Sequence, residues 1–341
     1  MRIQIDGASK SPLYKQITDQ IELAARDGRL AAGQLLPSMN ELAAQLKISK
    51  ETVKKSYGIL ADRGIIEPKQ GKGFFVRDRS GQAHMQVLVI FDRLSLYKQM
   101  LLDAFQQQLG PEAEITILNH NQSVDLLQYY LDNHVGRFDW YVIAPHFPPD
   151  PQIRQRCIRQ LRRIPFRKLI LVDHLLEGLK GQFGAVYQDF ENDIYDGLTE
   201  GLDANRRGTA LRVITFPTSL YGSRIRKGIE RFGADNGIPL EFLQKAPQQI
   251  RKGDTFLVLN SQLDGGLVEL ARQIRKQGLV IGEDVRIISY NEYEINELIL
   301  GGLTSVSTDF KEMGRIAARM ILSHELTKRR NPFHMTRRNS F

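Results

Sequence analysis

The sequence predicts an α/β protein with a small N-terminal winged helix-turn-helix and a larger portion of two similar parallel-sheet lobes. Residues 33–76 place two helix caps, two short helices and a glycine-tipped hairpin in succession. From residue 84 onward, short apolar strands alternate with amphipathic helices, as in parallel sheets covered by helices. The length of 341 residues also exceeds what one hydrophobic core normally holds, so more than one compact unit is expected.

The helix-turn-helix is predicted from its caps. Ser38 has Glu41 three residues later, the spacing of a capping box, so a helix begins here and ends near Leu46. Ser49 caps a second helix. At 3.6-residue spacing its inner face consists of Val53, Ser56, Tyr57 and Leu60. Its outer face carries Lys50, Glu51, Lys54 and Lys55.

A hairpin is predicted directly after this helix. Residues 65–67 and 74–76 form its strands, with a turn at residues 68–73. Glycines at the tip allow close approach to a backbone, because glycine has no side chain to clash. Lysines on one helix face are often only solvated charge, but this ordered set of elements favours nucleic acid. The net charge of +8 agrees, since residues 1–80 hold 14 Lys and Arg against 9 Asp and Glu.

The same stretch resembles the DNA-binding domain of the GntR family. Leu36-Pro37-Ser38, Glu41-Leu42-Ala43, Thr52-Val53 and Gln70-Gly71-Lys72-Gly73 match the family pattern in place. Asn40 stands where the family usually has an arginine, and Lys50 and Lys54 replace two arginines, so the operator sequence does not carry over. The resemblance implies that operator DNA is contacted by Ser38, Asn40, Ser49, Lys50, Thr52, Lys54, Lys55, Lys69, Gln70, Gly71, Lys72 and Gly73.

Composition and missing motifs exclude other classes. A single cysteine, Cys157, excludes an intramolecular disulfide framework. No apolar run approaches the roughly 18 residues that span a bilayer, and no signal peptide opens the chain, so we expect a cytoplasmic protein without a membrane partner. The sequence lacks a zinc-protease histidine pair, a Walker loop and a nucleophile elbow. We therefore predict no metal, no cofactor and no enzymatic activity.

Polar residues follow the predicted strands of the larger portion. Ligands of such sheets bind beyond the carboxyl ends of the strands. The positions there include Asp92, Arg93, Asn119, His120, His146, Asp173, His174, Tyr221, Asn260, Asn291 and Glu292. Each alone is more often a loop residue or a helix cap, but their recurrence in successive units indicates a ligand site. With aromatic neighbours such as Phe91 and Phe190, they suit a polyhydroxylated ligand.

This portion resembles the sugar-sensing domain of the LacI family. The resemblance is carried by residues 282–292, by residues 303–310 with Met313-Gly314, and by the closing Arg337-Arg338-Asn339-Ser340. It implies a periplasmic-binding-protein-like fold of two lobes joined by three crossings. The implied division is a winged helix-turn-helix at 1–77, a linker at 78–84 and an effector domain at 85–341. Lobe 1 then covers about 85–188 and 304–330, and lobe 2 about 189–303 with a C-terminal return.

The same resemblance implies a sugar between the lobes. The expected contacts are Asp92, Tyr97, His146, Asp173, Gln188, Asp189, Tyr221, Arg224, Asn260 and Asn291. Arg226 remains an alternative to Arg224, because neither has the family's spacing to Gly228. The combined pattern most resembles GntR/LacI hybrid regulators of sugar utilisation in Bacteroidetes, for which a deoxyhexose such as L-fucose or L-rhamnose is a plausible effector.

The function expected from these features is a DNA-binding regulator, active as a homodimer, whose operator binding responds to a sugar. Two alternatives belong to other classes. One is a sugar-binding protein with a vestigial head, which would retain DNA only weakly and without sequence preference. The other is a carbohydrate-active enzyme, which would need two carboxylates across a cleft, for example Asp92 and Asp189.

Overall fold

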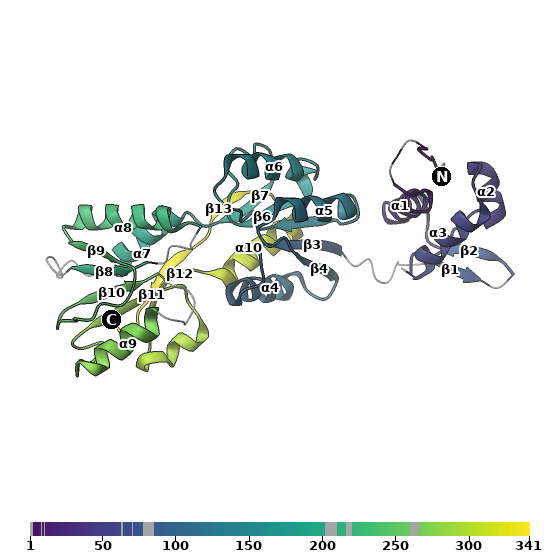
Figure 1. Cartoon of the computed structure of the whole chain (residues 1–341). Helices are drawn as coiled ribbons and strands as arrows, with labels where there is room; N and C mark the ends of the chain where they lie inside the picture. Colours follow the sequence, from purple (N-terminus) through teal and green to yellow (C-terminus); the bar gives the residue numbers. More distant parts are fainter. Residues whose placement is uncertain are drawn as a thin grey trace. The chain divides into compact units, whose positions relative to one another are not determined.

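The computed structural model describes residues 3–341 except 8, 10, 63, 70, 78–84, 202–209, 216–219 and 260–265 (Figure 1). The chain divides into two compact units. One comprises residues 1–86 with 112–114 and 134–139, and the other comprises 87–111, 115–133 and 140–341. The linker predicted at residues 78–84 lies outside the described residues. Among the described helices, none combines the length and apolar character that crossing a membrane requires.

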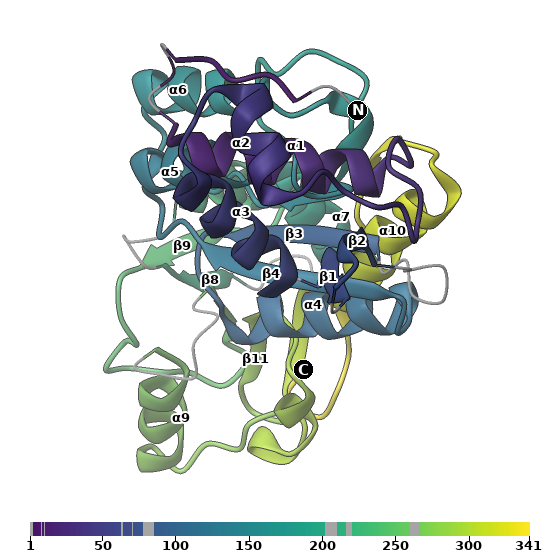
Figure 2. The ribbon, with the colours of Figure 1, turned by 90° about the vertical axis from the view of Figure 1, so that its right-hand side faces the viewer.

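The N-terminal unit contains a winged helix-turn-helix, whose three helices gather beside a two-stranded wing (Figures 1 and 2). Its elements are α1 (Leu13–Arg26), α2 (Met39–Leu46), α3 (Lys50–Asp62), β1 (Ile66–Lys69) and β2 (Gly73–Val76). The predicted inner face of α3 is confirmed, because Val53, Ser56, Tyr57 and Leu60 are all fully buried. Two hydrogen bonds add specificity to this core: Thr18 and Ser56 share one at 3.0 Å, and the Tyr57 hydroxyl donates to the Pro37 carbonyl at 2.7 Å.

The wing differs slightly from the sequence prediction. Residues 68 and 69, expected in the turn, continue β1 and pair with Phe74 and Gly73 of β2. Pro68 is tolerated there because a two-stranded hairpin consists of edge strands, where proline can direct its missing N–H away from the ladder. The tip is therefore shorter than predicted.

Lobe 1 is built on a six-stranded sheet in the order β13-β7-β6-β5-β3-β4, mostly parallel. In Figure 1, α4 and α10 lie on one side of this sheet and α5 and α6 on the other. The strands are β3 (Met85–Phe91), β4 (Ala113–Asn119), β5 (Trp140–Ile143), β6 (Leu169–Asp173), β7 (Gly184–Tyr187) and β13 (Lys328–Arg330). The helices are α4 (Leu96–Leu109), α5 (Val124–His134), α6 (Pro151–Leu161) and α10 (Phe310–Ser323).

Lobe 2 repeats this plan in a sheet of order β14-β12-β11-β10-β8-β9, in which only β14 is antiparallel to its neighbour. One apolar cluster joins α7 and α8 to one face of the sheet, and a second joins α9 to the other face. The strands are β8 (Leu211–Ile214), β9 (Leu240–Leu243), β10 (Thr255–Val258), β11 (Arg286–Tyr290), β12 (Thr304–Thr308) and β14 (Phe333–Thr336). The helices are α7 (Phe190–Gly201), α8 (Gly222–Asn236) and α9 (Gly266–Lys276).

The chain crosses between the lobes three times, after β7, after β12 and after β13. The expected lobe boundary at residue 304 is wrong by one strand: β12 is fully buried between β11 and β14 of the second sheet, so the crossing follows Thr308. Buried Asn331 ties the three crossings together. Its backbone N–H donates to Tyr187 O at 2.8 Å, and its side-chain amide donates to Thr308 Oγ1 at 2.7 Å and Asp309 O at 2.8 Å.

Candidate functional site

The outer face of α3 is polar and exposed. Lys50, Glu51, Lys54 and Lys55 all face solvent, opposite the buried stripe of the same helix. Lys54 lies 3.8 Å from Glu51, an exposed pair that restrains the ammonium only weakly. The Lys55 ammonium instead lies 3.9 Å from the centre of the Tyr14 ring on α1. Lys50 and Lys54 are therefore better placed than Lys55 to meet a phosphate backbone.

The serines and threonine of the predicted DNA-contacting set hold the helix starts. Ser38 Oγ accepts from the Glu41 N–H at 3.2 Å, while the Glu41 carboxylate accepts from the Ser38 N–H at 2.8 Å, so the predicted capping box is confirmed. Ser49 Oγ accepts from the Thr52 N–H at 3.2 Å and shares a second hydrogen bond with Thr52 Oγ1. Asn40 is exposed in the first turn of α2. These contacts orient the two helices whether or not the same groups also touch DNA.

The wing tip presents backbone and lysine. Gly71 and Gly73 have φ of 72° and 101°, the left-handed region that favours glycine, and open space surrounds the position of a Cβ at Gly71. Lys72 is exposed between them, whereas Lys69 lies 3.1 Å from Glu67 and over the Phe75 ring. Gln70 lies outside the described residues. Lys72 is thus the least committed cation among the described tip residues.

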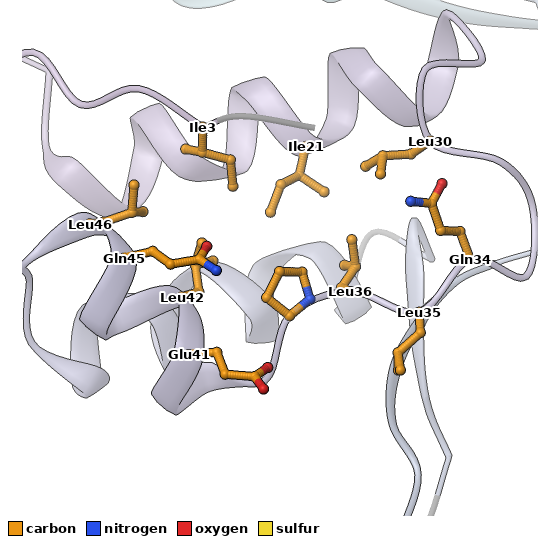
Figure 3. Close-up of a pocket in the computed structure, with 11 residues that line it drawn as sticks. Ile3, Ile21, Leu30, Gln34, Leu35, Leu36, Glu41, Leu42, Gln45 and Leu46 are labelled. Carbon is orange, nitrogen blue, oxygen red and sulfur yellow. The ribbon is translucent and has the colours of Figure 1, made fainter.

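A separate cavity of about 530 Å³ lies in the N-terminal unit, away from the outer face of α3 (Figure 3). Apolar side chains of the N-terminal segment, α1, α2 and the segment between these helices line it together with the polar side chains of Glu41, Gln34 and Gln45. Its lining residues are Ile3, Ile21, Leu30, Gln34, Leu35, Leu36, Pro37, Glu41, Leu42, Gln45 and Leu46. The Glu41 carboxylate is already used by the capping box.

In lobe 1, buried charges gather at the carboxyl ends of β3 and β6. Asp92 and Asp173 are each 4% exposed, and the Lys98 ammonium from α4 lies between them. Lys98 Nζ donates to Asp173 Oδ2 and lies 3.8 Å from Asp92 Oδ1. The Gln188 side chain donates to the other oxygen of Asp173. Burial opposes ionisation of Asp173, but Lys98 and His146 outweigh it and lower the pKa of this carboxyl below its usual range.

Aromatic rings connect lobe 1 to lobe 2 at this point. The Tyr221 ring, just before α8, stacks on Phe190 at 4.1 Å between ring centres and meets His146 edge-on at 4.6 Å and His174 at 5.0 Å. His146 Nδ1 lies 3.6 Å from Asp173 Oδ2, which is too far for a hydrogen bond. Burial lowers the pKa of His174 to about 4. The predicted residues His146, Asp173, Gln188 and Tyr221 are therefore brought together.

Lobe 2 contributes neutral polar groups. Asn291 directly follows β11, as Asp173 ends β6, and the two residues share a positive φ of 73° and 70°. Such backbone strain is uncommon outside glycine and concentrates at functional sites. Tyr290 is buried, and burial, together with Asp193 and Asp173, raises the pKa of its phenol. Asn260 lies outside the described residues.

Several buried polar atoms of this group have no hydrogen-bond partner within the described part of the chain. Buried polar groups are normally paired, and those that are not are candidates for binding a ligand or water. They include Asp92 Oδ1 and His146 Nδ1 of lobe 1, and Tyr221 OH, Tyr290 OH and Asn291 Oδ1 of lobe 2. These atoms, from both lobes, form the candidate effector site.

Arg224, rather than Arg226, faces this site. Arg224 pairs with Glu177 of lobe 1, which also lies 3.7 Å from Arg154, so the ion pair spans the two lobes. Arg226 turns away: it pairs with Glu230 at 2.7 Å and covers the Phe242 ring at 4.0 Å. The Arg224 hydrogen bond lowers the pKa of Glu177. This geometry favours the first of the two alternatives left open by the sequence.

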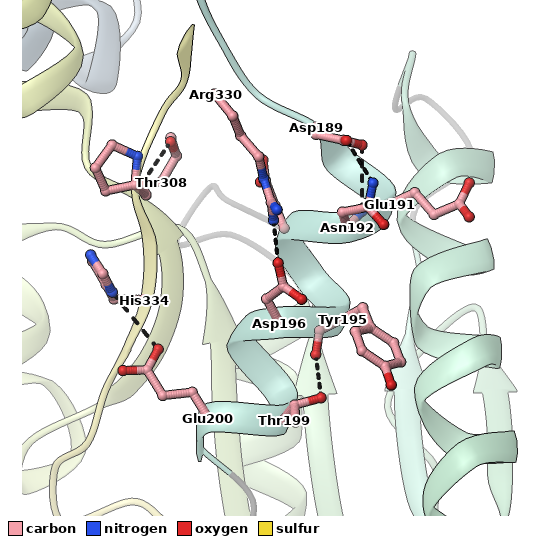
Figure 4. Close-up of polar contacts among 12 residues, drawn as sticks. Asp189, Glu191, Asn192, Tyr195, Asp196, Thr199, Glu200, Thr308, Arg330 and His334 are labelled. Atoms are coloured by element: carbon pink, nitrogen blue, oxygen red, sulfur yellow. Dashed lines mark hydrogen bonds and ion pairs between the residues drawn. The ribbon is translucent and has the colours of Figure 1, made fainter.

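Two predicted effector contacts have other partners in the structure. Asp189 precedes α7 and caps it by accepting from the Asn192 backbone N–H at 3.5 Å, and it also accepts from the Asn192 side chain at 2.6 Å (Figure 4). Tyr97 stacks on Phe310 at 5.0 Å and lies 6.0 Å from the Tyr293 ring, in an aromatic group beside the site. Neither residue contributes one of the buried polar atoms without a hydrogen-bond partner that are named above.

Sequence reasoning missed Lys98, Tyr290 and the groups at the crossings. Lys98 had a readable signal, because it occupies the apolar stripe of its helix with Leu101, Leu102, Phe105 and Leu109. A lysine on such a stripe needs a buried counter-charge. Arg330 had no comparable signal. It pairs with Asp193 of α7 at 2.5 Å and with Asp196 of the same helix at 2.7 Å, and Figure 4 shows the second contact. Burial raises the pKa of Asp193 to about 7 despite Arg330.

Comparison with known proteins agrees with both units. Residues 13–76 match the family model described as bacterial regulatory proteins, gntR family, and residues 206–340 match a periplasmic binding protein-like domain. The HTH-type transcriptional repressor YtrA of Bacillus subtilis (strain 168) is 33% identical over 102 residues, covering 30% of this chain and 78% of that protein. The arabinose metabolism transcriptional repressor of Halalkalibacterium halodurans is 23% identical over 345 residues, covering 91% and 88%.

The structure resembles the lac repressor dimer bound to operator and the anti-inducer ONPF, with a TM-score of 0.56, 14% identity and coverage of 78% of this chain and 99% of that one. At this identity the likeness shows a shared fold. The relatives are transcriptional regulators, and the prediction that the chain is not an enzyme is confirmed. The chain belongs to the GntR family of bacterial regulatory proteins, and it combines that family's DNA-binding domain with a periplasmic-binding-protein-like domain of LacI-like fold.

Proposed function

We propose that this regulator binds operator DNA under the control of a small sugar that binds where the strand ends of its two lobes meet. The proposal depends most on one observation: His146 of lobe 1 contacts Tyr221 of lobe 2, among buried polar atoms that lack partners within the described residues. Such a ring of hydrogen-bonding groups beside aromatic faces suits a polyhydroxylated ligand. A ligand that contacts both lobes would stabilise one arrangement of the lobes relative to the others.

The proposed working form is a cytoplasmic homodimer. Two copies present two α3 helices to half-sites about one helical turn apart, and the candidate contacts are the twelve residues from Ser38 to Gly73 identified above. The effector contacts are Asp92, His146, Asp173, Gln188, Tyr221, Arg224, Asn260 and Asn291, with Tyr97 and Asp189 as supporting neighbours. Asn331, which ties the three crossings, then marks the hinge.

For the effector we propose a deoxyhexose such as L-fucose or L-rhamnose, because the sequence resembles GntR/LacI hybrid regulators of sugar utilisation. The name of the Halalkalibacterium relative makes L-arabinose the next sugar to test. Because the Halalkalibacterium relative, which covers 91% of this chain, is named a repressor, we propose that the sugar releases the protein from DNA.

Fluorescence anisotropy with the DNA upstream of the protein's own coding sequence tests this function. We expect the protein to bind this DNA specifically at moderate salt, and we expect one of the sugars named above to weaken the binding. Linkage requires that operator DNA lower the affinity for that sugar by the same factor. Weak retention of any DNA sequence would instead indicate a vestigial head, and two independent affinities would remove the allosteric control.

A further inference from the structure

The charge balance of the candidate effector site restricts the ligand. Among the residues that the structure describes, the buried charged side chains are Asp92, Lys98, Asp173 and Asp193. Asp193 is paired with Arg330 at the crossings, so the other three belong to the strand ends of lobe 1. Two carboxylates against one ammonium leave a net negative charge in a buried place, where charges are poorly screened.

Apart from His146, which lies 3.6 Å from Asp173 Oδ2 and adds a positive charge only when it is protonated, the neighbouring groups do not cancel this charge. His174 is neutral at pH 7, because burial lowers its pKa to about 4. Burial and the carboxylates also keep the Tyr221 phenol protonated by raising its pKa. Gln188 and Asn291 carry no charge, and Glu292 beside Asn291 is paired with Arg338 at 2.6 Å.

Cations do lie at the edge of the site, but they are exposed or shared. The Arg93 side chain is 69% exposed and lies 3.9 Å from Asp92. Arg154 and Arg224 share the carboxylate of Glu177, with about 45% of each side chain exposed. Solvent screens such groups far more than the buried carboxylates.

The unpaired atoms select by hydrogen-bonding type as well. Asp92 Oδ1 and Asn291 Oδ1 accept hydrogen bonds only, and neither has a hydrogen-bond donor within reach among the described residues, since Lys98 Nζ is 3.8 Å from Asp92 Oδ1. A sugar hydroxyl can donate to them and can also accept from the Tyr221 and Tyr290 hydroxyls. A phosphate or carboxylate group placed against these two oxygens offers them acceptor oxygens instead of a donor, and would leave Asp92 and Asn291 without a hydrogen bond.

Given the proposed function, we infer that the site accepts an uncharged polyhydroxylated sugar and rejects its phosphorylated and carboxylated derivatives, with Asp92 and Asn291 accepting from ligand hydroxyls. Lys98 is a positioning residue that keeps Asp173 ionised and fixed. The regulator would then respond to a sugar before a phosphoryl-transfer reaction consumes it, and it would be blind to the product.

Thermal-shift measurements and calorimetry on the full chain test this inference. The probes are L-fucose, L-rhamnose, L-arabinose, D-glucose and D-xylose, beside L-fucose 1-phosphate, D-glucose 6-phosphate and D-glucuronate. A neutral sugar is expected to raise Tm, and its charged counterpart to bind about 100-fold more weakly. A charged derivative that binds as tightly as its parent overturns the inference and leaves sugar control intact. A panel in which neither class raises Tm, while operator DNA is still bound, contradicts the proposed sugar control itself.

Two substitutions locate the selectivity. Asp92→Asn should reduce the discrimination between neutral and charged sugar about tenfold, and Asp103→Asn on the exposed side of α4 should leave it unchanged. Asn291→Asp, at a positive φ that aspartate tolerates, should increase the discrimination by a similar factor. A ratio unmoved by both changes, in variants with native circular dichroism, would remove Asp92 and Asn291 from the site.

Discussion

The α3 face and the strand ends of lobe 1 both use lysine, but in opposite physical settings. On α3, the Lys54 side chain is 65% exposed, and the carboxylate it pairs with, Glu51, is 79% exposed. In lobe 1, Lys98 is 3% exposed and touches two buried carboxylates. An exposed lysine acts on a distant polyanion through a field that salt screens, whereas a buried one is part of the fold. The same residue type therefore predicts a salt-dependent binding effect in one place and a stability effect in the other.

The largest expected effect is the difference in stability between removing a buried lysine charge and removing an exposed one. Lys98→Met leaves Asp92 and Asp173 buried without their cation, and is expected to destabilise the effector domain by about 3–5 kcal/mol. Lys252→Met removes an exposed ammonium that pairs with half-buried Asp284 in the same unit, and should destabilise the protein far less. Chemical denaturation followed by circular dichroism measures both. Equal losses would contradict the proposed distinction.

The second effect concerns pH. In the unfolded chain His174 takes up a proton as pH falls through 6.5, but in the folded protein only near 4. The stability that neutral His174 contributes is complete above pH 6.5 and is lost as pH falls from 6.5 to 4, by up to about 3 kcal/mol. His174→Gln should therefore lose less stability than the parent over this interval.

Asp193 provides the opposite sign for comparison. Its folded pKa of about 7 lies above the ordinary value of 3.8, so its contribution is lost as pH rises between these values. As pH falls from 7 to 4, the Asp193→Asn variant should therefore lose more stability than the parent protein, and the His174→Gln variant should lose less. If the dependence of Tm on pH between 4 and 7 is the same in both variants as in the parent protein, neither group titrates as described.

The exposed lysines should give a smaller effect that salt reveals. Lys54→Ala and Lys72→Ala are each expected to weaken operator binding about three- to tenfold at low salt and to reduce the slope of log K against log salt by about 1. Fluorescence anisotropy across a salt series measures this. A slope unchanged in both variants would reject these two phosphate contacts.

The smallest effect is expected at Lys55. Its ammonium already lies over the Tyr14 ring, so Lys55→Ala should change operator affinity less than Lys54→Ala does, and should instead slightly lower the stability of the N-terminal unit. Thermal denaturation measures the change in stability, and the same salt series measures the change in operator affinity. A salt slope reduced as much as by Lys54→Ala would show that Lys55 leaves Tyr14 to bind DNA.

The sequence alone determined the winged helix-turn-helix and the class of the larger unit. Caps, 3.6-residue spacing and turn glycines act within a few residues, so Ser38, Ser49 and the buried stripe of α3 could be identified before any coordinates. The alternation of strands and helices likewise predicted two parallel sheets. Strands β7, β9, β12, β13 and β14 were not predicted, because they are short and their pairing depends on distant segments.

Only the tertiary structure decided which polar residues share a site. Lys98 and Asp173 are 75 positions apart, and Arg330 and Asp193 are 137 apart, so no local pattern could pair them. It also directed Arg224 toward Glu177 and Arg226 away from it, although both lie on the same helix. Local chemistry sets secondary structure, but the partners of a buried charge are chosen by the packing of elements that the chain brings together from afar.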